Sequence, residues 1–214
     1  MMDAAIFQYA SLFRRKQLEG IMTDCARVYA LVMSNGTILK NNENEIRDKL
    51  ADYLEDDGYK ANCTLTVKNF QVDHEVPEGP HGRVDIRFLP VNPYEGQKAY
   101  FIIECKRLDG SHHLNNEYVE HGIKRFKTTD KYSTLLGVNG MMGFLVKPLD
   151  VVATCGDINT HLTIDEQLIV VTGNVIPGCY DFESNLNAPS GMITLLHLWM
   201  DFSSSMKPAE PYAK

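Results

Sequence analysis

The sequence lacks most signs of a secreted, membrane-bound or disulfide-stapled protein. Its 214 residues include five cysteines, an odd number, and no two of them form a Cys-x-x-Cys pair. This pattern is typical of reduced thiols, so a disulfide framework is not expected. No hydrophobic run is long enough to cross a membrane, and the first apolar residues follow an acidic residue and precede basic ones, opposite to a secretion signal. We therefore expect a cytoplasmic protein with no membrane segment.

The chain also has no internal repeat and no low-complexity tract. With 44% hydrophobic residues it is long enough for one sizeable core, so we expect a single domain over residues 1–214. The net charge of −7 argues against indiscriminate tight binding to nucleic acid, but it permits a local basic cleft.

Two strand-like segments, residues 83–88 and 100–108, place ionised side chains inside apolar runs. The charged residues of interest are Asp85 in the first segment and Glu104 and Lys106 in the second. A buried carboxylate carries a large desolvation penalty unless a cation compensates it. We interpret these three residues as a site for a metal or a phosphate.

Strand geometry is expected to bring the three side chains together. Because side chains alternate between the faces of a strand, Glu104 and Lys106 share one face and Cys105 points to the other. The residues between the segments contain Asn-Pro and Glu-Gly steps, typical of a hairpin turn, here centred near residues 94–95. That register places Asp85 opposite Glu104. Two like charges about 5 Å apart destabilise a sheet, whereas a hard cation such as Mg²⁺ would be held by them.

A simpler alternative is an exposed ion pair between Glu104 and Lys106, with Asp85 paired to Arg83 or Arg87. Exposed pairs need no preceding Tyr-Phe-Ile-Ile run, so the sequence favours the buried site. In that site Lys106 would orient the attacking water, help to deprotonate it, or neutralise charge that develops on a phosphate.

The pattern resembles that of the PD-(D/E)XK, or restriction-endonuclease-like, nuclease superfamily. In that family an Asp on one strand is followed on the next strand by an acidic residue, any residue and Lys, here Asp85 and then Glu104-Cys105-Lys106, although Val84 replaces the usual preceding Pro. The resemblance covers roughly residues 40–150 and implies an α/β fold with a mixed central β-sheet flanked by helices. It also implies Mg²⁺-dependent hydrolysis of nucleic-acid phosphodiester bonds. We therefore predict a deoxyribonuclease that uses Mg²⁺ or Mn²⁺, with Asp85, Glu104 and the Cys105 carbonyl as metal ligands and Lys106 as the catalytic cation. A restriction or phage-defence endonuclease is the function that it suggests.

A helix before the two strands is where the family often places another Glu. Residues 41–58 begin with Asn, end at Gly and carry apolar residues at helical spacing, which predicts an amphipathic helix. Glu45 flanks its apolar stripe, and we predict it as a third acidic group and metal ligand, with Asp48 as its substitute. The alternative for Glu45 is an i,i+4 ion pair with Lys49.

After the motif, residues 108–132 are expected to form a turn that leads into a helix, and basic residues collect there. From Lys98 to Lys131 there are seven Lys or Arg against five Asp or Glu, in a chain that is acidic overall. Cations here can contact phosphates, although a solvated helical face explains the same charges. Arg125 is the phosphate contact that we select. The candidate nucleic-acid-binding residues are Arg83, Arg87, Arg107, Lys124, Arg125 and Lys127.

A rival hypothesis concerns the same segment. His113, Glu117 and His121 fall at i, i+4 and i+8, where side chains on one helical face can bind zinc. None of the full helical zinc signatures is present, so we favour an exposed polar stripe. A His-Asn-His nuclease built on His112, His113 and Asn115 lacks the hairpin that should precede it.

The remaining segments complete the expected order of elements. We predict helix over residues 3–35 and 151–158, strands within 64–76, 140–146, 167–172 and 191–202, a loop over 178–191 and a loose tail over 206–214. The domain thus has a helical extension (1–40), a motif-bearing core (41–150) and a C-terminal completion of the sheet (151–205). The extension is a candidate homodimer or substrate surface. The alternative function is a catalytically silent nucleic-acid-binding or protein-interaction module on the same fold, which the presence of all three motif residues disfavours.

Overall fold

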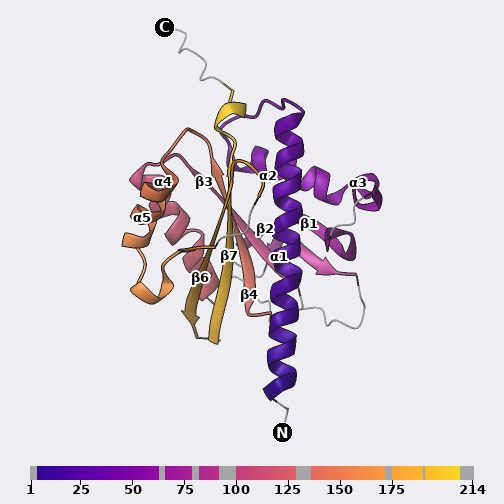
Figure 1. The fold of residues 1–214 in the computed structure, drawn as a ribbon, viewed down its shortest axis with the longest axis vertical. Coiled ribbons are helices and arrows are strands. Elements are labelled where there is room, and N and C mark those ends of the chain that lie inside the picture. Colours follow the sequence, from indigo (N-terminus) through magenta and orange to yellow (C-terminus); the bar gives the residue numbers. More distant parts are fainter. Residues whose placement is uncertain are drawn as a thin grey trace.

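The chain folds into one mixed β-sheet with helices on both faces (Figure 1). The computed structural model describes residues 4–62, 66–78, 82–91, 100–128, 136–171, 175–189 and 191–207. Within these residues seven strands pair in the order β1-β2-β3-β4-β7-β6-β5. Strands β3, β4 and β7 are parallel neighbours, and the remaining pairs are antiparallel. The predicted α/β class, a mixed sheet flanked by helices, is confirmed.

The elements have the following bounds. The helices are α1 (Ala4–Ser34), α2 (Glu43–Glu55), α3 (Asp57–Asn62), α4 (His112–Glu120) and α5 (Val151–Thr160), with 3-10 turns η1 (Thr66–Asn69), η2 (Ile123–Lys127), η3 (Ile164–Glu166) and η4 (Ser203–Ser205). The strands are β1 (Phe70–Glu78), β2 (Gly82–Pro90), β3 (Phe101–Leu108), β4 (Val138–Leu145), β5 (Ile169–Val170), β6 (Cys179–Ala188) and β7 (Gly191–Asp201). None of the described helices has the length and apolarity that a membrane crossing requires.

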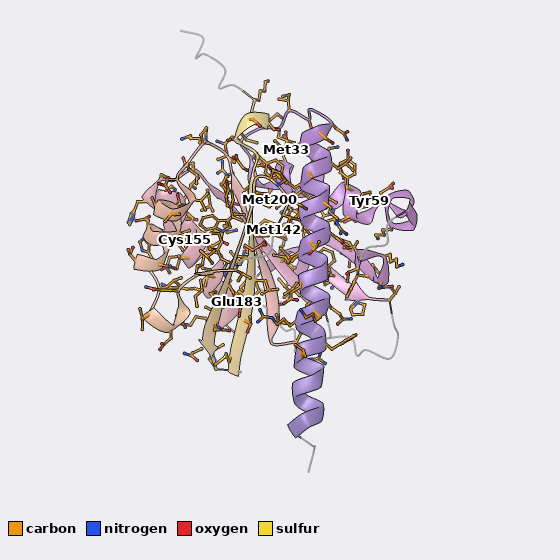
Figure 2. The ribbon with its side chains drawn as sticks, in the orientation of Figure 1. Met33, Tyr59, Met142, Cys155, Glu183 and Met200 are labelled. Atoms are coloured by element: carbon orange, nitrogen blue, oxygen red, sulfur yellow. The ribbon has the colours of Figure 1, made fainter. Side chains whose placement is uncertain are left out.

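Two hydrophobic clusters cover the two faces of the sheet. On one face, α1 and α2 bury apolar residues against Ile103, Met142 and Met200, and Figure 2 places the two methionines near the middle of the molecule beside α1. On the other face, α4, η2 and α5 pack against Ile102 and Trp199. Because both faces are covered, the central strands β3 and β4 are buried along nearly their whole length. A charged side chain on β3 is therefore forced into the interior.

The register of the β2–β3 hairpin is as predicted. Ile86 pairs with Ile103, Arg87 with Ile102 and Phe88 with Phe101, all symmetric about the expected turn. The turn itself, near residues 94–95, lies outside the described residues, as do residues 208–214 of the predicted tail.

Three predicted segments were wrong. Residues 178–191 were expected to form a loop but contain β6. Its buried residues alternate with more exposed ones from Phe182 to Leu186, but most residues of the strand are polar, so the sequence shows no hydrophobic alternation. The predicted buried strand over residues 167–172 is a two-residue edge strand with both side chains exposed. The helix expected after the motif ends at Glu120, and the chain continues as the 3-10 turn η2. Between them lies Gly122, where a side chain would clash with the Tyr118 carbonyl.

A buried polar network ties α4 to the sheet. The Tyr118 hydroxyl lies 2.8 Å from Nδ1 of His197, accepts a hydrogen bond from the indole of Trp199 at 3.0 Å, and so donates its own hydrogen to Nδ1. Nε2 of His197 then carries the proton and donates it to Ser184 at 2.9 Å. Burial lowers the pKa of His197 to about 3, so the imidazole is neutral in the folded protein.

This histidine makes stability depend on pH. The unfolded state binds a proton at His197 below its ordinary pKa of 6.5, whereas the folded state binds it only near 3, so stability falls as pH drops from 6.5 towards 3. Between pH 8 and pH 5 the wild-type protein should lose about 2 kcal/mol more than His197→Gln, which keeps a donor and an acceptor but does not titrate. Urea unfolding, followed by the fluorescence of the single tryptophan, measures the difference. Equal losses in both proteins would contradict the assignment.

Candidate active site

Asp85 lies where β2 separates from β3. The last pair of their ladder is Ile86 with Ile103, and one residue further the carboxylate of Asp85 accepts a hydrogen bond from the main-chain N–H of Cys105 at 2.8 Å (Oδ2). The Cys105 side chain is fully buried in the core on the α1 side of the sheet, as predicted. Beyond the end of the ladder, a side-chain oxygen of Asp85 thus accepts the main-chain N–H of β3 in place of a main-chain carbonyl.

Glu104 and Lys106 lie side by side, as predicted. The Nζ atom of Lys106 is 3.0 Å from Oε1 of Glu104 and 2.8 Å from the carbonyl oxygen of Cys105. Glu104 is fully buried and Lys106 is 9% exposed. The alternative of a surface ion pair is therefore wrong for these residues.

The charge state of Lys106 follows from its neighbours. Burial by itself lowers the pKa of the Lys106 ammonium. The negative charges of Glu104, Glu43 and Asp85 act in the opposite direction and outweigh burial, so the pKa lies above its ordinary value. Lys106 is therefore protonated at neutral pH.

The leading helix contributes Glu43 rather than Glu45. Oε1 of Glu43 lies 3.2 Å from Nζ of Lys106, and Oε2 accepts the main-chain N–H of Arg107 at 3.1 Å. Glu45 instead accepts the main-chain N–H of Lys40 at 2.8 Å. The helix is capped by Asn42, whose side chain accepts the N–H of Glu45, so Glu43 is the first helical residue. Identifying Asn42 as the cap in the sequence would have directed attention to Glu43.

The helix also supplies a cation that the sequence analysis did not identify. Arg47 is 2% exposed, and its guanidinium lies 3.2 Å from Oδ1 of Asp85 and 2.7 Å from carboxylate oxygens of both Glu75 and Asp48. The predicted alternative partners of Asp85 are engaged elsewhere, because Arg83 pairs with Glu75 and Arg87 with Asp73. Arg47 lies three and seven residues before the buried Leu50 and Leu54, and this helical spacing was the available signal for its burial.

Two of the six predicted phosphate-binding residues lie beside the motif. Arg125, on η2, is paired with Glu104, and the guanidinium of Arg107 donates to the main-chain and side-chain oxygens of Asn41 at 2.9 and 2.8 Å. Lys124 and Lys127 pair with Glu120 and Glu166, and neither borders the site.

Glu43, Lys106 and the two arginines lie on the wall of a polar cleft of about 440 Å³. It is lined by Glu43, Lys106, Arg107, His113, Leu114, Glu117, His121 and Arg125. The predicted stripe of His113, Glu117 and His121 thus forms one side of the cleft, facing Lys106. Within the described part of the chain the ligand atoms of these three residues do not all come within 4.8 Å of one another, so the geometry does not support zinc binding by the stripe.

The oxygen atoms around Lys106 suit a hard cation. The ammonium is a cation surrounded by Oε1 of Glu43, Oε1 of Glu104 and the Cys105 carbonyl at 2.8 to 3.2 Å. Carboxylate and carbonyl oxygens are the ligands that Mg²⁺ prefers, and it is commonly held by one or two carboxylates together with water and substrate phosphate. The residues present therefore fit Mg²⁺ or Mn²⁺. Their function has to be argued from this geometry, because the chain matches no protein-family model, no curated protein and no solved structure.

Proposed function

We propose that the protein is a Mg²⁺- or Mn²⁺-dependent deoxyribonuclease, an endonuclease with a restriction-endonuclease-like fold. The observation that carries the proposal is the group of Asp85, Glu104 and Lys106 at the point where β2 and β3 separate, beside an open polar cleft. Such a group of charges in a sheet interior carries a large desolvation penalty, which a role in catalysis explains. The cleft is open to a polyanionic strand and is lined by two arginines.

The residues have separate tasks in this mechanism. Asp85, Glu104 and the Cys105 carbonyl would hold the metal, with Glu43 in the place predicted for Glu45. When bound, Mg²⁺ polarises the scissile phosphate and increases the acidity of water at the site.

Lys106 acts as a cation. Its ammonium, which donates to the oxygens of Glu43, Glu104 and Cys105, would donate hydrogen bonds to phosphate oxygens on which charge develops. Arg125, which is already directed at the buried Glu104, lies at the same wall of the cleft and would contact the adjacent phosphate.

Cleavage assays with Asp85→Ala test the proposal. Purified protein is incubated with supercoiled plasmid and with labelled single-stranded DNA and RNA, in Mg²⁺, in Mn²⁺ or with a chelator. We expect metal-dependent cutting of DNA by the wild type and a loss of at least about a hundredfold in the variant, because a metal ligand is removed. The matched control is Asp73→Asn, which breaks another carboxylate–arginine pair on the neighbouring strand β1 and should cut normally. Cutting by Asp85→Ala at the wild-type rate would refute the mechanism.

A catalytically silent binding module is the second candidate function. It is favoured by one observation, which is that each motif carboxylate already has a cationic partner. Asp85 pairs with Arg47, and Glu104 pairs with Lys106 and Arg125. A closed ion network of this kind can be purely structural. Calorimetric titration with Mn²⁺ separates the candidates, since the nuclease binds metal at Asp85 and the silent module does not.

A further inference from the structure

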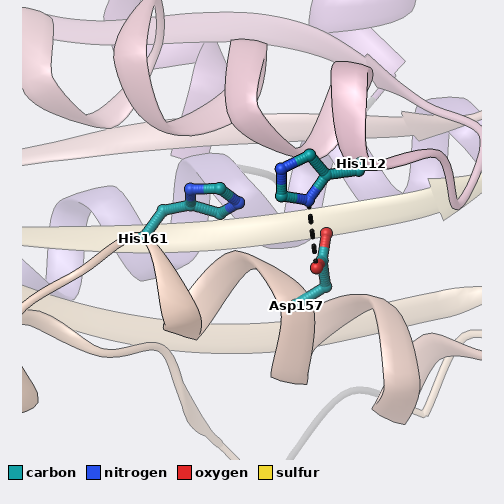
Figure 3. A group of neighbouring side chains, drawn as sticks. All are labelled: His112, Asp157 and His161. Carbon is teal, nitrogen blue, oxygen red and sulfur yellow. Dashed lines mark hydrogen bonds and ion pairs between the residues drawn. The ribbon is translucent and has the colours of Figure 1, made fainter.

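Two histidines and one aspartate from α4 and α5 meet on the face of the molecule opposite α1. His112 is the first residue of α4, Asp157 lies on α5, and His161 caps the end of α5 (Figure 3). One ligand atom from each lies within 4.8 Å of the other two. Among the described residues no other three His, Cys, Asp or Glu side chains converge in this way.

The distance between the ligand atoms of His112 and Asp157 is that of two ligands of one metal ion. Nδ1 of His112 is 3.3 Å from Oδ1 of Asp157. Ligand atoms at about 2.0 to 2.1 Å from a tetrahedral zinc ion are separated from one another by about 3.3 Å. The imidazoles of His112 and His161 lie beside each other, with ring centroids 4.7 Å apart. His112 and Asp157 therefore already have the separation of two zinc ligands, and the ligand atom of His161 lies within 4.8 Å of both.

Two further features point to a ligand at this place. Nε2 of His161 is buried and has no hydrogen-bond partner among the described residues, although a buried imidazole nitrogen is normally satisfied. The carboxylate of Asp157 is oriented from behind, because the buried Asn115 donates a hydrogen bond to its Oδ2 at 2.8 Å. Support of a ligating carboxylate by such an outer hydrogen bond is a recurrent feature of metal sites.

We propose that His112, Asp157 and His161 form a zinc site that ties α4 to α5. Two imidazoles and one carboxylate suit Zn²⁺ rather than Mg²⁺, and the exposed side of His112 leaves a fourth position for water. The site is distinct from the candidate active site and does not depend on the nuclease proposal. Its position gives it a consequence for that site, since His113, the next residue, lines the polar cleft. Bound zinc would fix the start of the helix that forms one wall of the cleft.

Metal titration of the full chain tests this site. Metal-free protein is titrated with Zn²⁺ by calorimetry and with Co²⁺ by visible absorption, which reports coordination directly. We expect one tight equivalent in the wild type, and an affinity at least about tenfold weaker in His161→Ala and in Asp157→Asn. The matched controls are His113→Ala and His121→Ala, from the neighbouring stripe, together with Asp85→Ala, all with unchanged zinc affinity.

Each contrary outcome would overturn the proposal. Wild-type affinity in His161→Ala, or a loss in His113→Ala as large as in His161→Ala, would place zinc elsewhere, and a wild-type protein that binds no zinc would remove the site altogether. Fluorescence of the buried Trp199 verifies that each variant is folded. Zinc should also raise the melting temperature of the wild type and of His113→Ala but not of His161→Ala.

Discussion

Replacement of Lys106 by alanine is expected to reduce DNA cleavage by at least about a hundredfold while leaving Mg²⁺ binding in place. The ammonium donates to Glu43, Glu104 and the Cys105 carbonyl. Its removal takes away the cation that would face the phosphate but leaves every oxygen that would hold the metal. The rate of plasmid cleavage and calorimetric Mg²⁺ binding, measured on the same preparation, separate the two effects.

The stability of Lys106→Ala is a second measurement, because the variant removes a cation beside a buried carboxylate. Without Lys106, the fully buried Glu104 loses the cation that lies 3.0 Å from its carboxylate, so the metal-free variant should be less stable than the wild type. Mg²⁺ should then raise the melting temperature of Lys106→Ala by more than that of the wild type, because it replaces the lost charge. Lys106→Met, which fills the space, tests whether lost packing explains the result.

A surface lysine provides the control. Lys147 is 60% exposed and pairs with Asp109, so Lys147→Ala should change stability by no more than about 1 kcal/mol and cleavage not at all. Cleavage by Lys106→Ala at the wild-type rate would remove Lys106 from the mechanism, and a loss of Mg²⁺ binding would give it a role in shaping the metal site instead.

The hairpin could be predicted from the sequence because short-range rules determine it. The alternation of side chains and the turn signals between the strands gave the register in which Ile86 pairs with Ile103. The Tyr-Phe-Ile-Ile run before Glu104 indicated that this carboxylate is buried, and it is fully buried. The sequence therefore predicted the environment of the motif as well as its strands.

Other parts of the site depend on contacts that no local rule contains. Glu43 rather than Glu45 contacts β3, and the salt bridge of Arg47 joins a helix to strand residues 28 and 38 positions away. The zinc site has the same origin, since His112 and Asp157 are separated by 45 residues and meet only because α4 packs beside α5. Polar residues that pair across elements carry no periodic signal in the sequence.

Replacement of Arg47 by methionine is expected to lower the free energy of unfolding by roughly 3 kcal/mol. Of its three carboxylate partners, Asp85 is the most buried, with 14% of its side chain exposed against 36% for Glu75 and 45% for Asp48. The loss should therefore come mainly from Asp85, whose one described salt bridge is with Arg47. Urea unfolding in the presence of a chelator measures it.

A matched arginine and a double variant isolate this effect. Arg15 also bridges two glutamates, but its side chain is 36% exposed, so Arg15→Met should lower stability by only about 0 to 1 kcal/mol. Combining Arg47→Met with Asp85→Asn should destabilise by less than the sum of the two single changes, because the second change removes the charge that the first leaves unpaired. Strict additivity, or a loss no larger than that of Arg15→Met, would show that the buried pair does not stabilise the fold.

The Arg47→Met variant also tests the proposed metal site. Arg47 and the metal ion are two cations that would both bind Asp85, so the guanidinium competes with the metal for that carboxylate. Arg47→Met should accordingly bind Mg²⁺ more tightly than the wild type and regain in Mg²⁺ a large part of the stability that it loses in chelator. If Mg²⁺ stabilises the variant and the wild type equally, Asp85 is not a metal ligand, and the ion network of Arg47 and Asp85 is structural. If the gain is found in Arg47→Met and is abolished by adding Asp85→Asn, the carboxylate that secures the end of β2 is also the one that binds the catalytic metal.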